Sequence, residues 1–158
     1  MSPTRFRPFR LAAWGLPGLA LAAQLVPVAR VNPPVTAELH APPVVHELLV
    51  RACYDCHSHR TDWPWYSGVA PVSWLVARDV RAGREELNFS SWDGASDRAA
   101  RRLRECAEEL REGEMPPTPY LVLHPEARLD PGEREALLAW LDPVAGRSAP
   151  GRSGGESP

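Results

Sequence analysis

The sequence predicts a small all-α domain, and three observations support this fold class. Apolar residues recur at helical spacing in four separate segments between residues 44 and 143. Glycine, proline and capping residues mark where several of these segments begin and end. No segment shows the regular alternation of apolar and polar residues that is typical of a half-buried strand. The 158 residues are enough for one such domain with additional terminal segments.

About four helices are expected, and some of them begin or end at recognisable residues. They cover residues 44–53, 72–84 and 97–112, and a last segment that starts at Pro131. Gly113 is expected to end the third helix, because glycine readily adopts the left-handed conformation that follows many helices. Asp130 and Glu133 predict a capping box at the start of the fourth helix. The segments between the helices, 61–71, 87–95 and 115–124, are expected to be irregular.

Residues 1–29 have the pattern of a signal peptide or a signal anchor. Arginines precede an apolar run, Leu11 to Ala29, that would span about 28 Å as a helix. This charge bias predicts a cytoplasmic N-terminus and an exported remainder. We therefore expect a bacterial inner-membrane anchor with the domain facing the periplasm. If the signal is cleaved, for which Ala20-Leu21-Ala22 is suited, the protein would be periplasmic.

The rest of the chain divides by composition into three parts. Residues 30–43 are expected to form a Pro-rich linker, because proline favours extended backbone. Residues 44–143 form the expected folded domain. Residues 144–158, rich in Gly, Ser, Pro and Arg, are expected to be a disordered tail. The net charge of −2 gives no indication of nucleic-acid binding.

The segment Cys53-Tyr54-Asp55-Cys56-His57 is the most specific chemical motif of the chain. The spacing C-x-x-C-H is the attachment signature of a c-type haem. Residues three and four positions apart share a helix face, so both thiols can reach the two vinyl groups of one porphyrin. We therefore expect one covalent haem c, with thioethers at Cys53 and Cys56 and with His57 as the proximal iron ligand. In bacteria this attachment takes place outside the cytoplasm, in agreement with the export signal.

Two other chemistries use the same residues. Cys53, Cys56, His57 and His59 could ligate zinc, and Cys106 could supply a further thiolate. A C-x-x-C pair could also exchange disulfides, but the βαβ pattern of a thioredoxin-like fold is missing. The export signal and the all-α pattern favour haem. Cys106 lies on the apolar face of the third expected helix and is expected to be a buried, inert thiol.

Met115 is the expected sixth ligand of the iron. It is the only methionine besides Met1, and Pro116 and Pro117 stiffen the loop that contains it. A methionine sulfur opposite a histidine nitrogen raises the reduction potential and favours electron transfer. His124 is the alternative ligand. His59 lies too close to His57 in sequence to cross the haem plane.

Several short stretches carry a family resemblance that covers most of residues 30–142. They are Asn32-Pro33-Pro34-Val35, Cys53-Tyr54-Asp55-Cys56-His57-Ser58, Trp63-Pro64-Trp65-Tyr66, Ala70-Pro71-Val72-Ser73-Trp74, Leu87-Asn88-Phe89-Ser90-Ser91-Trp92, Met115-Pro116-Pro117 and Leu138-Ala139-Trp140-Leu141. With these stretches the chain resembles the bacterial haem-binding domain proteins, small membrane-anchored or exported relatives of class I cytochrome c. The resemblance implies a cytochrome c-like helical fold around a covalent haem. It also implies thioethers at Cys53 and Cys56 and axial ligation by His57 and Met115.

These observations together predict a monohaem c-type cytochrome domain that transfers single electrons in the periplasm and is not an enzyme. Its expected partners are haem, an unidentified redox protein and the inner membrane, without nucleic acid. The alternative is a haem-based gas or redox sensor, or a peroxidase-like protein, with a labile sixth ligand. A structural zinc module ranks below both.

Overall fold

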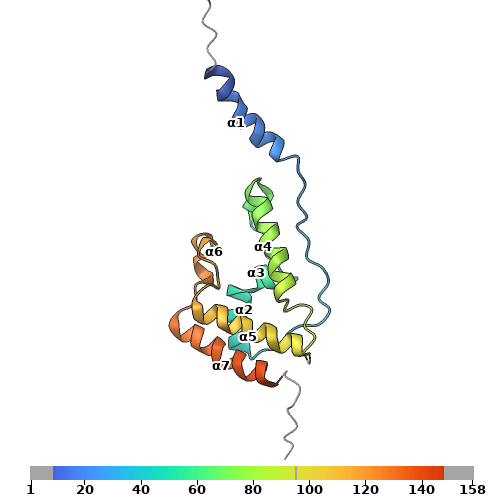
Figure 1. Cartoon of the computed structure of the whole chain (residues 1–158), viewed down its shortest axis with the longest axis vertical. Coiled ribbons are helices and arrows are strands. Elements are labelled where there is room, and N and C mark those ends of the chain that lie inside the picture. The colour runs from blue at the N-terminus through green and yellow to red at the C-terminus, as the bar shows by residue number, and fades with distance from the viewer. Residues whose placement is uncertain (1–8, 95, 148–158) are drawn as a thin grey trace, which may run out of the picture. The chain divides into compact units, whose positions relative to one another are not determined.

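The computed structural model describes residues 9–94 and 96–147, and Figure 1 shows that this part of the chain is built from helices. The prediction of an all-α fold is thereby confirmed. The described chain forms two compact units. The first contains residues up to Val31 together with Trp63–Asp79, and the second contains Asn32–Asp62 together with residues from Val80 onward. One helix, α4 (Val72–Glu86), begins in the first unit and ends in the second.

The first unit contains α1 (Phe9–Ala23), the short 3-10 helix η1 (Trp65–Gly68) and the first part of α4. Gln24, which follows α1, is bonded twice to Ala70. Its Nε2 donates to the Ala70 carbonyl at 3.1 Å, and its Oε1 accepts from the Ala70 amide at 3.0 Å. α1 is shorter than the apolar run from which it was predicted. Among the described residues, none of the helices combines the length and the apolar character that a membrane crossing requires.

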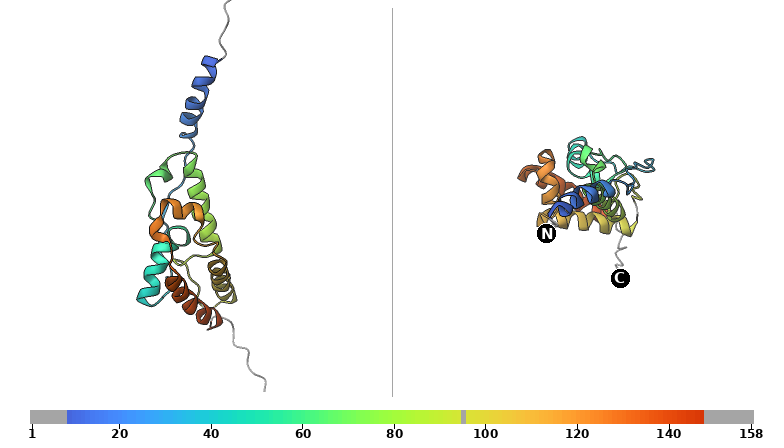
Figure 2. Two further views of the ribbon diagram at one scale, coloured as in Figure 1. Left: turned by 90° about the vertical axis from the view of Figure 1, so that its left-hand side faces the viewer. Right: turned by 90° about the horizontal axis from the view of Figure 1, so that it is seen from above.

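The second unit has a core formed by α2 (Pro43–Ala52), α5 (Asp97–Glu112) and α7 (Pro131–Arg147). α5 packs along α7, and α2 contacts α7, as both ribbon views show (Figures 1 and 2). The innermost side chains of this core, all almost fully buried, are Leu49, Phe89, Leu103, Leu137 and Leu141. Most of them were expected from their helical spacing, and α5 has the predicted bounds.

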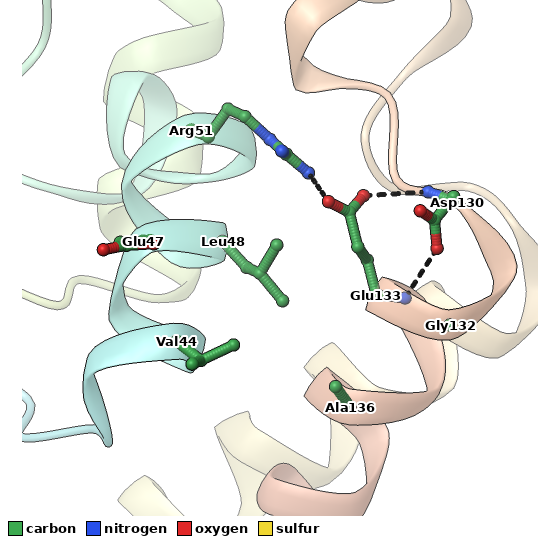
Figure 3. A pocket seen from close by; sticks show the side chains of 8 residues that line it. All are labelled: Val44, Glu47, Leu48, Arg51, Asp130, Gly132, Glu133 and Ala136. Atoms are coloured by element: carbon green, nitrogen blue, oxygen red, sulfur yellow. Dashed lines mark hydrogen bonds and ion pairs between the residues drawn. The ribbon is translucent and has the colours of Figure 1, made fainter.

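The start of α7 has the predicted capping box. The two residues of this box, Asp130 and Glu133, line an open groove between α2 and α7 (Figure 3). The Glu133 carboxylate accepts from the Asp130 amide at 3.0 Å, and the Asp130 carboxylate accepts from the Glu133 amide at 2.8 Å. Arg51 on α2 forms an ion pair with Glu133 at 2.6 Å across this groove. None of the expected haem ligands lines it.

Two segments differ from the prediction at the C-terminal end. The segment after Met115 contains α6 (Thr118–Leu123) and the 3-10 helix η2 (Pro125–Ala127), where only irregular chain was expected. Pro119, in the first turn of α6, favours a helix start, because its fixed φ suits that position. α7 continues to Arg147 and so passes residue 144, where the tail was expected to begin. Residues 148–158 lie outside the described part of the chain.

Residues 32–39, expected to lie in a linker, run along the second unit and are here called the strap. The amides of Thr36 and Ala37 donate to the Ser90 carbonyl at 3.0 and 3.2 Å. The Leu39 amide donates to the Phe89 carbonyl at 2.9 Å, and Leu39 is buried. The strap is therefore part of the folded unit, because its backbone polar groups are paired with residues 89–90.

Candidate haem site

The C-x-x-C-H motif occupies one tight turn that follows α2. The Cys53 amide still bonds to the Leu49 carbonyl at 2.9 Å, but the Cys53 backbone leaves the helical conformation and α3 (Tyr54–His57) begins. The amides of Cys56 and His57 both donate to the Cys53 carbonyl, at 3.2 and 2.9 Å. The turn therefore brings two thiols and one imidazole together, and neither thiol forms a disulfide.

The His57 ring is oriented by two carbonyl groups of α4 and its end. Nδ1 lies 2.9 Å from the Gly83 oxygen and 3.0 Å from the Leu87 oxygen. Because a carbonyl only accepts, we assign the proton to Nδ1 as the donor. Nε2 then keeps its lone pair for a metal, and such an outer hydrogen bond fixes the ring orientation of a ligating histidine. Burial lowers the pKa of His57, although the hydrogen bonds to Leu87 and Gly83 oppose this shift. The ring therefore favours its neutral, ligating form.

Gly83 allows α4 to approach the motif closely enough for this arrangement. A Cβ atom at Gly83 would lie 2.6 Å from the Cys56 carbonyl oxygen, which is far too close. A side chain at this position would therefore push the carbonyl of residue 83 away from His57. The sequence offered one signal that was missed: an isolated glycine within a helical pattern often marks a close packing contact.

Phe89 supports the motif from the core side. Its amide donates to the His57 carbonyl at 2.8 Å, and its side chain is fully buried. The Phe89 ring stacks on Tyr54, with centroids 5.4 Å apart, and meets the His57 ring edge-on at 6.3 Å. Phe89 therefore connects the motif backbone and the imidazole to the hydrophobic core.

Arg84 fixes the chain directly after the motif. Its Nε donates to the Ser58 carbonyl at 2.7 Å, and one terminal nitrogen donates to Thr61 Oγ1 and Asn32 Oδ1, both at 2.9 Å. The Ser58 hydroxyl in turn donates to the Tyr54 carbonyl at 2.7 Å. The role of Arg84 could not be predicted, because its three partners are distant in sequence and all lie in segments between helices.

Two of the three thiols, those of Cys53 and Cys106, lie in an apolar environment. Burial raises the pKa of Cys53, with smaller contributions from Cys106 and Cys56. Burial also raises the pKa of Cys106 to about 11. Cys53 and Cys106 both pack against the main core cluster. Cys106 is therefore protonated and packed against apolar residues, as expected for an unreactive thiol.

Met115 lies in the turn after α5, in contrast to the packed His57. Its side chain is 38% exposed, and its amide bonds weakly to the Glu109 carbonyl at 3.4 Å. The following α6 contains no buried residue. A hydrogen bond connects it to the motif: the Tyr120 hydroxyl donates to Asp55 Oδ2 at 2.7 Å. The structure thus gathers Cys53, Cys56 and His57 on one turn and places Met115 in a separate segment.

The other candidate histidines have their rings engaged. His124 stacks on Tyr120, with centroids 4.3 Å apart, and its Nδ1 lies 3.0 Å from a Glu126 carboxylate oxygen. His59 Nδ1 lies 2.9 Å from the Pro34 carbonyl oxygen, and its Nε2 lies 2.8 Å from Asn88 Nδ2. Within residues 9–94 and 96–147, no cluster of three or more His, Cys, Asp or Glu side chains suited to a metal ion occurs.

The donor set of the turn fits a haem. Two thiols lie beside a neutral imidazole whose Nδ1 is already bonded, so that Nε2 can ligate iron. Fold and donor set together are therefore those expected of a small all-α haem-binding protein.

Comparison with known families agrees with this class. A family model described as a haem-binding domain matches residues 18–143, and the chain belongs to that family. The predicted haem binding is thereby confirmed. Neither the curated proteins nor the solved structures contain a match to the chain.

Proposed function

We propose that this protein is a monohaem c-type cytochrome that transfers single electrons and catalyses no reaction of its own. The observation that carries the proposal is the His57 ring, which two backbone carbonyls hold beside both motif cysteines. Bound haem supplies the one-electron chemistry, while the protein sets its orientation, exposure and potential.

Cys53 and Cys56 are proposed to hold the haem through thioethers. Each thiol would add across one vinyl group, so the sulfur–hydrogen bond is replaced by a sulfur–carbon bond without an external oxidant. Support comes from the single turn that carries both thiols and from the absence of a disulfide at either of them. The raised pKa of Cys53 keeps its thiol protonated in the folded chain, so attachment is favoured before the core has closed around it.

Met115 is proposed as the sixth ligand. Its side chain is exposed enough to turn toward a bound group, and Pro116 and Pro117 restrict the backbone beside it. His124 is less suited because its ring is stacked and bonded. A methionine opposite His57 predicts a high potential and simple electron transfer.

A second candidate, a haem sensor or peroxidase-like protein with a labile sixth ligand, is favoured by the weak attachment of the Met115 segment. α6 has no buried residue, so this side can open more easily than the side of His57. Carbon monoxide binding separates the two candidates. A cytochrome with firmly bound Met115 binds this gas slowly, whereas Met115→Ala should bind it at once.

We also propose that the domain works in the bacterial periplasm, with residues 1–29 as its signal or membrane anchor and a redox protein as its partner. The support is the sequence pattern of arginines followed by an apolar run. The mass of the mature protein, together with its partition between membrane and soluble fractions, tests whether the segment is retained. Recovery of unprocessed protein from the cytoplasm with its segment intact would contradict this location.

The attachment chemistry is tested first. The chain is produced in a host with c-type haem maturation, denatured and extracted with acidified solvent. A c-type pyridine haemochrome that stays on the polypeptide is expected for the wild type, and haem that is extractable or absent for Cys53→Ala/Cys56→Ala. Cys106→Ala is the matched control and should keep covalent haem. Extractable haem in the wild type would contradict the proposal.

A further inference from the structure

We propose that the hydrogen bond between Tyr120 and Asp55 is a latch that holds Met115 in place as the sixth ligand. The inference rests on the proposed ligation by Met115 and adds a positioning residue to that site. Tyr120 lies on α6, and Asp55 lies inside the C-x-x-C-H motif, 65 positions earlier in the chain. One bond of 2.7 Å therefore connects the segment of the sixth ligand to the turn that carries the fifth.

The acceptor end of the latch is rigid. The Asp55 Oδ1 atom accepts from the Asp62 amide at 2.9 Å, and the Asp55 carbonyl accepts from Thr61 Oγ1 at 2.7 Å. Oδ2 is thereby directed toward Tyr120, and a hydroxyl that donates to a carboxylate makes a strong hydrogen bond. Asp55 cannot follow Tyr120 if α6 moves, because its other oxygen and its backbone are already held.

The donor end is anchored at the two ends of its segment, since Pro116 before α6 and Ala127 after it are buried and η2 contacts α2, but α6 itself packs loosely. None of the α6 residues is buried, and Val122 and Leu123 are 72% and 58% exposed. The stacked ring of His124 belongs to the same segment, and the main contact of α6 with another element is to η2, which follows it directly. Between these two anchored ends, the latch connects the middle of α6 directly to the motif.

The restraint on Tyr120 reaches Met115 because the two residues are close in sequence and the segment between them is rich in proline. Pro116, Pro117 and Pro119 lie in the intervening segment, and each fixes one backbone φ angle. Because this segment is stiff, fixing Tyr120 at the motif also limits where the Met115 sulfur can reach. Loss of the hydroxyl should therefore release Met115 from the iron while the haem stays attached.

The test compares two tyrosines that occur in the same protein. Tyr120→Phe removes the latch hydroxyl and keeps the ring, and Tyr66→Phe removes the hydroxyl of a tyrosine that lies on η1, outside the motif. Both full-length variants are prepared with haem. We expect Tyr120→Phe to keep covalent haem but to bind carbon monoxide roughly tenfold faster than wild type. This fold-change corresponds to the free energy of one strong hydrogen bond. Its sulfur-to-iron charge-transfer absorption should weaken and its reduction potential should fall, whereas Tyr66→Phe should match wild type in all three.

Further variants distinguish failure of the latch from failure of Met115 ligation. If Met115→Ala leaves carbon monoxide binding unchanged, the proposed sixth ligand is wrong. If Met115→Ala opens the iron and Tyr120→Phe behaves like wild type, the latch is wrong. Asp55→Asn keeps an acceptor without its charge and should give an intermediate rate. This variant also tests the latch should Tyr120→Phe fail to accumulate, and a wild-type rate for it would overturn the proposal.

Discussion

His57 and Met115 are the two expected axial ligands, and the protein holds them in very different ways. The His57 ring is bonded to two carbonyl oxygens, its backbone to Phe89, and its turn is in direct contact with α4 at Gly83. Met115 is 38% exposed in a turn, followed by a helix without buried residues. One side of the site is thus organised by the core, and the other by a few surface contacts.

This difference shows which part of a haem site a chain can build by itself. A proximal histidine needs only hydrogen bonds and packing from its own protein to reach its final tautomer and orientation. On the proposed distal side, the exposed apolar residues of α6 would find partners only on a bound haem. We therefore expect substitutions near His57 to affect stability, and substitutions near Met115 to affect ligand binding.

The largest expected effect is on the proximal side. Phe89→Ala removes a fully buried ring that contacts both Tyr54 and His57, and should lower the free energy of unfolding by about 3 to 5 kcal/mol. Val122→Ala on the distal helix is the control and should change it by less than about 0.5 kcal/mol, because Val122 is 72% exposed. Urea denaturation of both variants measures the difference. Equal losses of unfolding free energy would contradict the contrast between the His57 side and the Met115 side.

A smaller loss is expected at the helix contact. Gly83→Ala places a Cβ atom 2.6 Å from the Cys56 carbonyl oxygen, so α4 must shift, and stability should fall by about 1 to 3 kcal/mol. Gly132→Ala is the matched control. A Cβ atom at Gly132 would lie 3.4 Å from Asp130 Oδ1, which is an ordinary contact. The Gly132→Ala substitution should therefore stabilise the protein by up to about 1 kcal/mol. Thermal unfolding reports both, and a neutral Gly83→Ala would show that α4 does not need this close approach.

The smallest effect concerns pH. The pKa of His57 is lowered by burial from its ordinary value of 6.5, so the unfolded chain takes up a proton near that pH before the folded chain does. Stability should therefore rise with pH through this window and be lost as pH falls below about 6.5. The effect is measurable in Cys53→Ala/Cys56→Ala, where no covalent haem occupies the ring. Urea titrations between about pH 5 and 8 give the free energy of unfolding as a function of pH. Its slope against pH should be shallower when His57→Gln is added to the Cys53→Ala/Cys56→Ala variant, and identical slopes would contradict a buried neutral histidine.

The sequence was informative where local chemistry decides the structure. α5 follows from an apolar stripe that ends at a left-handed Gly113, and the capping box of α7 follows from Asp130 and Glu133. The motif likewise identified the three residues that the turn brings together. In each case, residues within about four positions of one another contain the information.

The features that the sequence did not predict depend on contacts between residues that are distant in sequence. The strap was predicted to be part of a Pro-rich linker, because nothing in its own composition indicates that it pairs with Phe89 and Ser90. α6 is too short for its apolar periodicity to be recognised, and only Pro119 marks its start. The carbonyls that orient His57 carry no side-chain signature at all. Such features are properties of the folded backbone.

The strap also has a consequence for the order of events as the chain emerges during the proposed export. Thr36 bonds to Ser90, 54 positions later, so this pairing of the strap with residues 89–90 cannot form until that part of the chain has emerged. The motif emerges in between, and Phe89, which covers it from the core side, arrives together with the partner of the strap. In the proposed export, the two thiols reach the periplasm before the residues that later enclose them. The late partner of an early segment would thus set a period in which the proposed haem c can be attached before the fold closes.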